Sequence, residues 1–192
     1  MGDEENRPIV AVGRNCWRIS RADRATVIVD AADYYHFIRQ AMEEARRRIL
    51  IIGWDFDPRI KLDRRAKGRE GDETLGGFLL HLARKKPHIS IGILKWNFGA
   101  MKTLFRGSAI AWVARLAATK AIQFKLDSAH PPGCSHHQKI VVIDDCFAVC
   151  GGIDMTGDRW DRPAHKDDDP DRIRPNGKPY GPWHDATMAV DG

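Results

Sequence analysis

Residues 25–54 read ATVIVDAADYYHFIRQAMEEARRRILIIGW, which predicts a strand, a helix and a second strand in succession. The β-branched run over residues 25–29 ends at Asp30, a residue type that favours the position just before a helix. Apolar side chains at helical spacing predict a helix over about residues 31–48. The continuously apolar residues 49–54 then predict a short strand that is buried on both faces.

The alternation of strands and helices continues along the chain. Apolar residues over 75–82 mark a second helix, and residues 88–94 alternate as a strand. Ser108 can cap a third helix, and residues 121–126 form another candidate strand. This order predicts an α/β fold, a sandwich with a mixed, largely parallel sheet, in a single domain over residues 1–192.

The composition is that of an ordinary globular protein. Of the 192 residues, 43% are hydrophobic and 30% are charged, and the formal net charge is +5. This basic excess fits an anionic partner such as a phosphate ester, a lipid surface or nucleic acid, and it fits a plain soluble protein almost as well. Four cysteines in a chain of this length exclude a disulfide scaffold.

The sequence shows no targeting segment. No apolar run approaches the roughly 18 residues of a membrane span. Residues 1–8 also lack a basic stretch that leads into an apolar one, as a signal peptide would have. We therefore expect a cytoplasmic or peripheral membrane protein without a signal peptide, with secretion by a non-classical route left open.

Residues 135–144, SHHQKIVVID, carry the most chemistry. Their apolar end predicts a buried strand, on which His137 and Lys139 project from the same side. A lysine neutralises phosphoryl oxygens, and a histidine is a nucleophile or proton carrier near neutral pH. Asp144 has the opposite parity and ends the run, so we favour a structural role for it over direct catalysis.

A returning strand over residues 146–150 is followed by Gly151, Gly152 and Asp154. Paired glycines let the backbone approach a ligand closely, and their N–H groups can face an anion. These three residues are therefore candidates for binding phosphate.

The patterns H-x-K-x4-D and G-G-x-D resemble the phospholipase D superfamily. The chain resembles the phospholipid-cleaving branch along nearly its whole length, at residues 53–57, 127–131, 151–161 and 182–192. The G-G-x-D form departs from the G-S-x-N of the small nuclease branch. Enzymes of the superfamily bring two H-x-K-x4-D motifs together across one cleft, and residues 1–192 contain one. The resemblance therefore implies an N-terminal half-domain of phospholipase D-like fold, completed by a C-terminal half.

The resemblance implies the reaction and its partners. It implies hydrolysis of a glycerophospholipid of the phosphatidylcholine type, at a membrane surface, to phosphatidic acid and a free alcohol. His137 would form a covalent phosphohistidine and Lys139 would balance charge in the transition state, with no metal and no cofactor. Relatives carry an orienting carboxylate at the P-W-H-D position, which is Asp185 here. That role requires an Asp185 oxygen about 2.6–3.2 Å from His137 Nδ1, whereas the alternative is that Asp185 caps a loop.

Several alternatives stay open. A single-motif chain could form a homodimeric nuclease, although G-G-x-D and P-W-H-D disfavour nucleic acid as the partner. The chain could instead be an inactive half-domain that only binds phosphate or an anionic membrane. A zinc site among Cys134, His136, His137, Cys146 and Cys150 competes with the interpretation of Cys146 and Cys150 as core thiols. The long stretch 157–184 is either a lid or a solvated insertion, and its acidic run 167–171 is predicted to be solvated.

Overall fold

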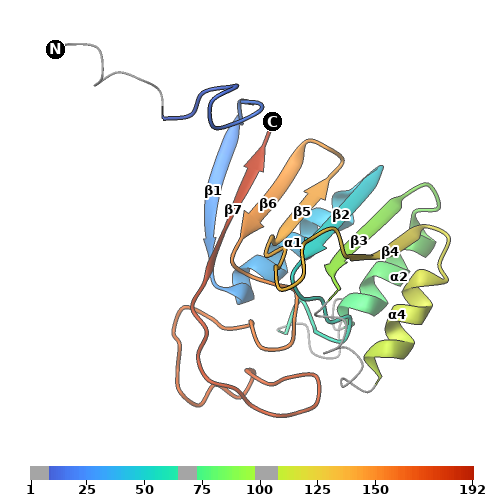
Figure 1. Cartoon of the computed structure of the whole chain (residues 1–192). Helices are drawn as coiled ribbons and strands as arrows, with labels where there is room; N and C mark the ends of the chain where they lie inside the picture. Colours follow the sequence, from blue (N-terminus) through green and yellow to red (C-terminus); the bar gives the residue numbers. More distant parts are fainter. Residues whose placement is uncertain (1–8, 65–72, 98–107) are drawn as a thin grey trace.

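The computed structural model of the chain describes residues 9–64, 73–97 and 108–192. Within the described residues, three helices lie between the strands in the predicted order (Figure 1). They are α1 (Ala31–Glu44), α2 (Leu75–Lys85) and α4 (Ala109–Ala117). The strands are β1 (Arg24–Val29), β2 (Arg48–Gly53), β3 (Ser90–Trp96), β4 (Ile122–Asp127), β5 (Ile140–Ile143), β6 (Phe147–Gly151) and β7 (Ala186–Asp191). Within the described ranges no helix has the length and apolarity to cross a membrane.

The seven strands form one open sheet in the order β1-β7-β6-β5-β2-β3-β4. The neighbours β2, β3 and β4 run parallel. The pairs β1–β7, β7–β6, β6–β5 and β5–β2 are antiparallel. The prediction of an α/β fold with a mixed sheet is confirmed. "Largely parallel" holds only for the β2–β4 part, because the hairpin β5–β6 and the strand β7 insert between β1 and β2.

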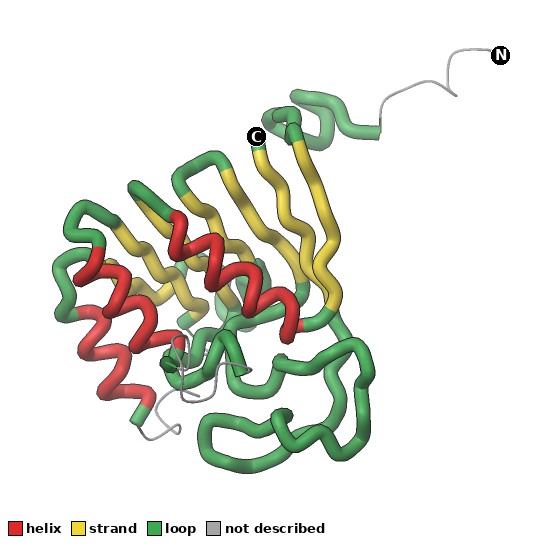
Figure 2. The backbone as a smooth tube through the Cα atoms, turned by 180° about the vertical axis from the view of Figure 1, so that it is seen from behind, coloured by secondary structure: helices red, strands yellow, loops and turns green. Residues whose placement is uncertain are grey.

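The described helices cover one face of the sheet, as Figure 2 shows from behind. The strands direct alternate apolar residues at these helices. In β2, Ile49 and Ile51 are buried, while Leu50 and Ile52, which alternate with them, are only half-buried. The expectation that this strand is buried on both faces is therefore wrong for the described part of the chain. The main core lies between the helix layer and the sheet. The catalytic candidates His137 and Lys139 lie just before β5.

Helix α1 begins directly after Asp30 but ends at Glu44, earlier than the predicted residue 48. The side chain of Asp30 does not cap α1. It is fully buried, the backbone φ is 63°, and the carboxylate turns toward residues of the long segment before β7. The pattern thus located the start of the helix correctly and gave Asp30 the wrong partner.

The long connection between β6 and β7 is packed around one buried arginine. The Arg172 guanidinium, 1% exposed, donates to the carbonyl oxygens of Lys166, Asp167 and Tyr180 and to the carboxylate of Asp161. Asp169 is also buried and pairs with Arg162 at 2.7 Å, so the expectation that the acidic run is solvated is wrong for Asp169, while Asp167 and Asp168 are exposed. Ion pairs and carbonyl groups surround the buried arginine.

Candidate active site

The structure brings His137 and Lys139 together just before β5. The Lys139 carbonyl oxygen accepts a hydrogen bond of 3.2 Å from the Gly151 N–H, which extends the pairing of β5 with β6 by one residue. Lys139 Nζ lies 3.3 Å from each ring nitrogen of His137. The Lys139 side chain is only 7% exposed, whereas His137 is exposed. A buried cation beside an accessible imidazole is the arrangement that a phosphate ester can approach from solvent.

Asp154 holds the lysine in place. Its Oδ2 lies 3.2 Å from Lys139 Nζ, and its backbone oxygen accepts the Tyr35 hydroxyl at 2.6 Å. Burial raises the pKa of the Asp154 carboxyl above its ordinary value, although the N–H of Asp55 and the Lys139 ammonium act in the opposite direction. The Asp154 carboxylate therefore contacts Lys139, and its predicted role in binding phosphate stays a prediction.

A second buried ion pair lies beneath this one. Lys95 Nζ at the end of β3 is 2.9 Å from Asp55 Oδ1, which follows β2. The Thr156 hydroxyl donates to Asp55 Oδ2 at 2.8 Å. Our sequence reasoning missed these residues, although a lysine and an aspartate at the ends of otherwise apolar strands were a usable signal. The two ion pairs fix the segment 154–156 against the ends of β2 and β3.

Aromatic rings line one side of His137. Trp54 lies 5.4 Å from the His137 ring, between centroids, and stacks on Trp96 at 5.7 Å. Lys139 Nζ lies 5.8 Å from the centre of the Trp54 ring, so the indole also contacts the cation. The neighbouring His136 ring lies within hydrogen-bond distance of the Asp127 carboxylate.

Gly151 and Gly152 serve the packing of β7. The Gly151 N–H donates to Lys139 and the Gly152 N–H donates to the Ala186 oxygen at 3.0 Å, so these groups are used within the sheet. A Cβ on Gly152 would lie 2.1 Å from Asp185 Oδ1. This differs from the expected phosphate cradle, because protein atoms fill the space that the missing side chains leave. The glycines let Asp185 approach the backbone of the site.

The structure places Asp144 away from this cluster. His137 precedes β5 and Asp144 follows it, so the strand separates them. The Asp144 carboxylate accepts hydrogen bonds from the backbone N–H groups of residues 46–48 at 2.7–2.8 Å. Partial burial acts to raise the pKa of Asp144, but these three donors together lower it below its ordinary value. The geometry favours the structural role for Asp144.

Asp185 lies at the same end of the sheet as His137, because β5 and β7 run in the same direction and both residues precede their strands. Gly151 pairs with Lys139 on one side and with Thr187 on the other, so these three residues lie in one row across the sheet. His137 comes two residues before Lys139, and Asp185 comes two residues before Thr187. The Asp185 carboxylate accepts the Ala186 N–H at 2.7 Å. Within the described residues, no hydrogen bond joins it to the His137 ring. Its orienting role therefore stays a prediction.

The cysteines gather at no common point in the described part of the chain. Cys134, Cys146 and Cys150 are free and exposed, which corrects the interpretation of Cys146 and Cys150 as core thiols. The described residues bring a different set of metal-binding side chains together, namely Asp30, His165 and His184.

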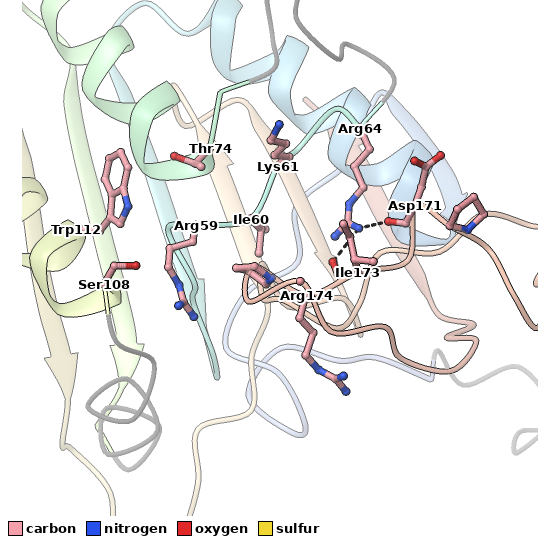
Figure 3. Close-up of a pocket in the computed structure, with 13 residues that line it drawn as sticks. Arg59, Ile60, Lys61, Arg64, Thr74, Ser108, Trp112, Asp171, Ile173 and Arg174 are labelled. Carbon is pink, nitrogen blue, oxygen red and sulfur yellow. Dashed lines mark hydrogen bonds between the residues drawn. The ribbon is translucent and has the colours of Figure 1, made fainter.

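A cavity of about 510 Å³ lies between the β2–α2 connection, α4 and the long segment before β7 (Figure 3). Arg64 crosses its wall and donates to the carbonyl oxygens of Asp171 and Ile173. None of the residues predicted for catalysis lines this cavity. The arginine ties the segment before β7 to the rest of the molecule.

An exposed histidine beside a buried lysine, at the start of a strand in a mixed sheet, is an arrangement suited to proteins that act on phosphate esters. The sequence profile described as "Phospholipase D" matches residues 41–192. The chain belongs to the phospholipase D family.

Curated relatives show the same family. Phospholipase D C of Dictyostelium discoideum is 26% identical over 85% of this chain, and phospholipase D delta of Arabidopsis thaliana is 28% identical over 79%. Human phospholipase D1 is 30% identical over 72% of this chain. The chain spans only 12%, 23% and 13% of the lengths of these three relatives.

Solved structures show the same fold at low sequence identity. NucT from Helicobacter pylori matches with a TM-score of 0.54 and 11% identity, covering 88% of this chain and 85% of NucT. Nuc from Salmonella typhimurium, described as a phospholipase D family member, matches with a TM-score of 0.51 and 15% identity, covering 88% of this chain and 84% of that one.

Proposed function

We propose that His137 and Lys139 form the first half of a phosphodiesterase site that hydrolyses glycerophospholipids to phosphatidic acid and a free alcohol. The observation that carries the proposal is the 3.3 Å contact between the exposed His137 ring and the buried Lys139 ammonium. The phospholipid class rests on the G-G-x-D and P-W-H-D stretches and on relatives named phospholipase D. A second H-x-K-x4-D motif, in a C-terminal half, would complete the cleft.

The proposed reaction has two displacements at phosphorus. A ring nitrogen of His137 attacks phosphorus, the N–P bond forms, and the P–O bond to the headgroup alcohol breaks. The departing alkoxide takes a proton from the histidine of the second motif. Lys139 donates hydrogen bonds to the non-bridging oxygens while negative charge builds on them, and Asp154 keeps its ammonium in place. Water, deprotonated by the second histidine, then cleaves the N–P bond and releases phosphatidic acid.

The covalent intermediate gives a direct test. The protein with both halves present is incubated with a short-chain phosphatidylcholine, and the adduct is located by intact-mass and peptide-mass measurement. We expect a phosphatidyl group on His137 in the wild type and in the control His136→Gln, and none in His137→Gln. An adduct that persists in His137→Gln, or turnover by that variant, would contradict the assignment of the nucleophile.

A homodimer is the second candidate. The observation that favours it is coverage, because this chain spans 84% and 85% of the Nuc and NucT chains and far less of the curated relatives. Two copies could then each give one histidine and one lysine to a shared site. Sedimentation decides the assembly: a mass near 21.7 kDa supports the missing second half, and twice that mass supports the dimer. Cleavage of plasmid DNA by the chain would favour the nuclease alternative. Binding of phosphate without turnover of any substrate would favour the inactive half-domain.

A further inference from the structure

Asp30, His165 and His184 bring three metal-binding atoms together from separate parts of the chain. Asp30 lies between β1 and α1, and the two histidines belong to the segment before β7. His184 Nδ1 is 2.9 Å from Asp30 Oδ1, and His165 Nε2 is 3.1 Å from Asp30 Oδ2. The two histidine nitrogens are 3.1 Å apart. These side chains play no part in the proposed reaction.

A neighbouring carboxylate sets the protonation of His165. Its Nδ1 lies 3.0 Å from Asp161 Oδ2, and Asp161 is fully buried. The Asp161 carboxylate is held by the N–H groups of Trp183 and Arg162 and by the Arg172 guanidinium. A hydrogen bond from Nδ1–H to this carboxylate leaves the lone pair of a neutral His165 on Nε2. That nitrogen lies 3.1 Å from His184 Nδ1, within hydrogen-bond geometry, and 3.1 Å from Asp30 Oδ2.

Asp30 cannot satisfy this lone pair. Its Oδ2 is buried and accepts no hydrogen bond from any described residue. A neutral imidazole nitrogen and a carboxylate oxygen at 3.1 Å are both acceptors, so a proton or a metal ion must lie between them. His184 Nδ1 faces Asp30 Oδ1 and His165 Nε2, and a single N–H at that position can serve only one of these two acceptors.

The spacing of these atoms fits a small transition-metal ion. Zinc is bound by histidine and aspartate at about 2.0–2.2 Å, which places tetrahedral ligand atoms about 3.3 Å from one another. The two histidine nitrogens are 3.1 Å apart, close to that value, and each lies 2.9–3.1 Å from one of the two carboxylate oxygens of Asp30. Imidazole donors favour zinc and its neighbours over calcium or magnesium. Asp161 behind His165 is the carboxylate that commonly orients a metal-binding histidine.

We propose that Asp30, His165 and His184 bind a divalent transition-metal ion, with Zn²⁺ as the best match. The ion fastens the segment before β7 to the junction of β1 and α1. It also fixes the backbone of Asp185, whose N–H donates to Asp30 Oδ1 at 3.2 Å and whose carbonyl oxygen accepts the Asp30 N–H at 2.8 Å. The site is structural and does not depend on the proposed reaction.

Metal binding by the purified chain tests the proposal. The chelator-treated chain is titrated with Zn²⁺ against a chromogenic chelator, and with Co²⁺ while the visible absorption is recorded. We expect one ion per chain, a Co²⁺ spectrum of a low-coordinate site, and a higher unfolding midpoint with Zn²⁺. His184→Ala, whose parent side chain is 69% exposed and so is not needed for packing, is expected to raise the Kd for Zn²⁺ at least about 100-fold.

The matched control is His81→Gln, which removes an exposed imidazole from α2 and should leave the Kd unchanged. Circular dichroism checks that each variant folds. Wild-type affinity in folded His184→Ala would overturn the proposal. Failure of the folded wild type to bind one Zn²⁺ per chain at micromolar concentration would overturn it equally, since a proton on His165 Nε2 would then fill the gap.

Discussion

At the scale of single residues, Asp144 stabilises the fold through its charge. Asp144→Asn keeps the size of the side chain and tolerates the left-handed backbone, with φ 54°, but it replaces one acceptor oxygen with an NH₂ group. The new donor faces backbone N–H groups of residues 46–48. We expect the free energy of unfolding at pH 7 to fall by about 1–3 kcal/mol.

The loss should depend on pH in a defined direction. The pKa of Asp144 is lower in the folded chain than in the unfolded one, so its stabilisation is present above the unfolded pKa of about 3.9 and is lost as the pH falls through the folded pKa. Urea unfolding curves of wild type and variant should therefore converge in acid. The control is Asp145→Asn, which breaks an exposed ion pair with Arg48 and should cost under about 1 kcal/mol. An equal loss at all pH values would contradict the role of the charge.

Asp185 gives a prediction for activity. If its carboxylate orients the His137 ring when substrate binds, Asp185→Asn should slow formation of the phosphatidyl adduct by about 10²-fold or more while the far-ultraviolet dichroism stays unchanged. Asp168→Asn, an exposed aspartate of the same segment, is the matched control and should react at the wild-type rate. Equal rates in the two variants would show that Asp185 only caps the segment.

At the scale of elements, the pairing of β6 with β7 depends on a bare backbone at Gly151. An alanine Cβ there would lie 2.4 Å from the Thr187 Cα and 2.6 Å from the Ala186 oxygen. Because these are backbone atoms, the strands must separate, and Gly151→Ala should lower the free energy of unfolding by about 1–3 kcal/mol. Gly181→Ala, which meets open space, should stay within about 0.5 kcal/mol of wild type in the same denaturant titration. If both variants matched wild type, the packing argument would be wrong.

Elements were predictable where local pattern decides them. The strand over residues 140–143 was located to the residue, and the β-α-β order is confirmed. The partners of the strands were not predictable, because β1 joins β7 and not β2, and local patterns do not encode such a distant pairing. The side chain of Asp30 failed as a cap for a similar reason, since its partner His184 lies 154 positions further along the chain.

The candidate site divides in the same way. His137 and Lys139 are two residues apart, so strand geometry alone predicted their contact. Lys95 and Asp55 come together only because β2 and β3 are neighbours in the sheet, and Arg172 is buried only because a folded segment surrounds it. The chemistry of single residues could therefore be predicted from the sequence, whereas the assembly of these residues into a site depends on tertiary contacts.

At the scale of the whole molecule, the strand order predicts a gradient of protection. β2 and β5 have strands on both sides, whereas β1 and β4 each have one neighbour. In native-state hydrogen exchange measured by mass spectrometry, we expect amides of β2 and β5 to exchange most slowly and those of β1 and β4 much faster. Val27 and Val29 of β1 are 64% and 41% exposed, so little apolar burial slows the opening of that strand. Protection of β1 equal to that of β2 would contradict this order.

The union of β1 with β7 also has a consequence in time. A ribosome makes the chain from its amino end at roughly 5–20 residues per second, so Arg24 emerges long before its partner Asp191. Until β7 is made, β1 lacks its neighbour in the described sheet, whereas β2 to β6 can already pair with one another. β1 can therefore complete its pairing only after β7 has been made, later than every other described strand.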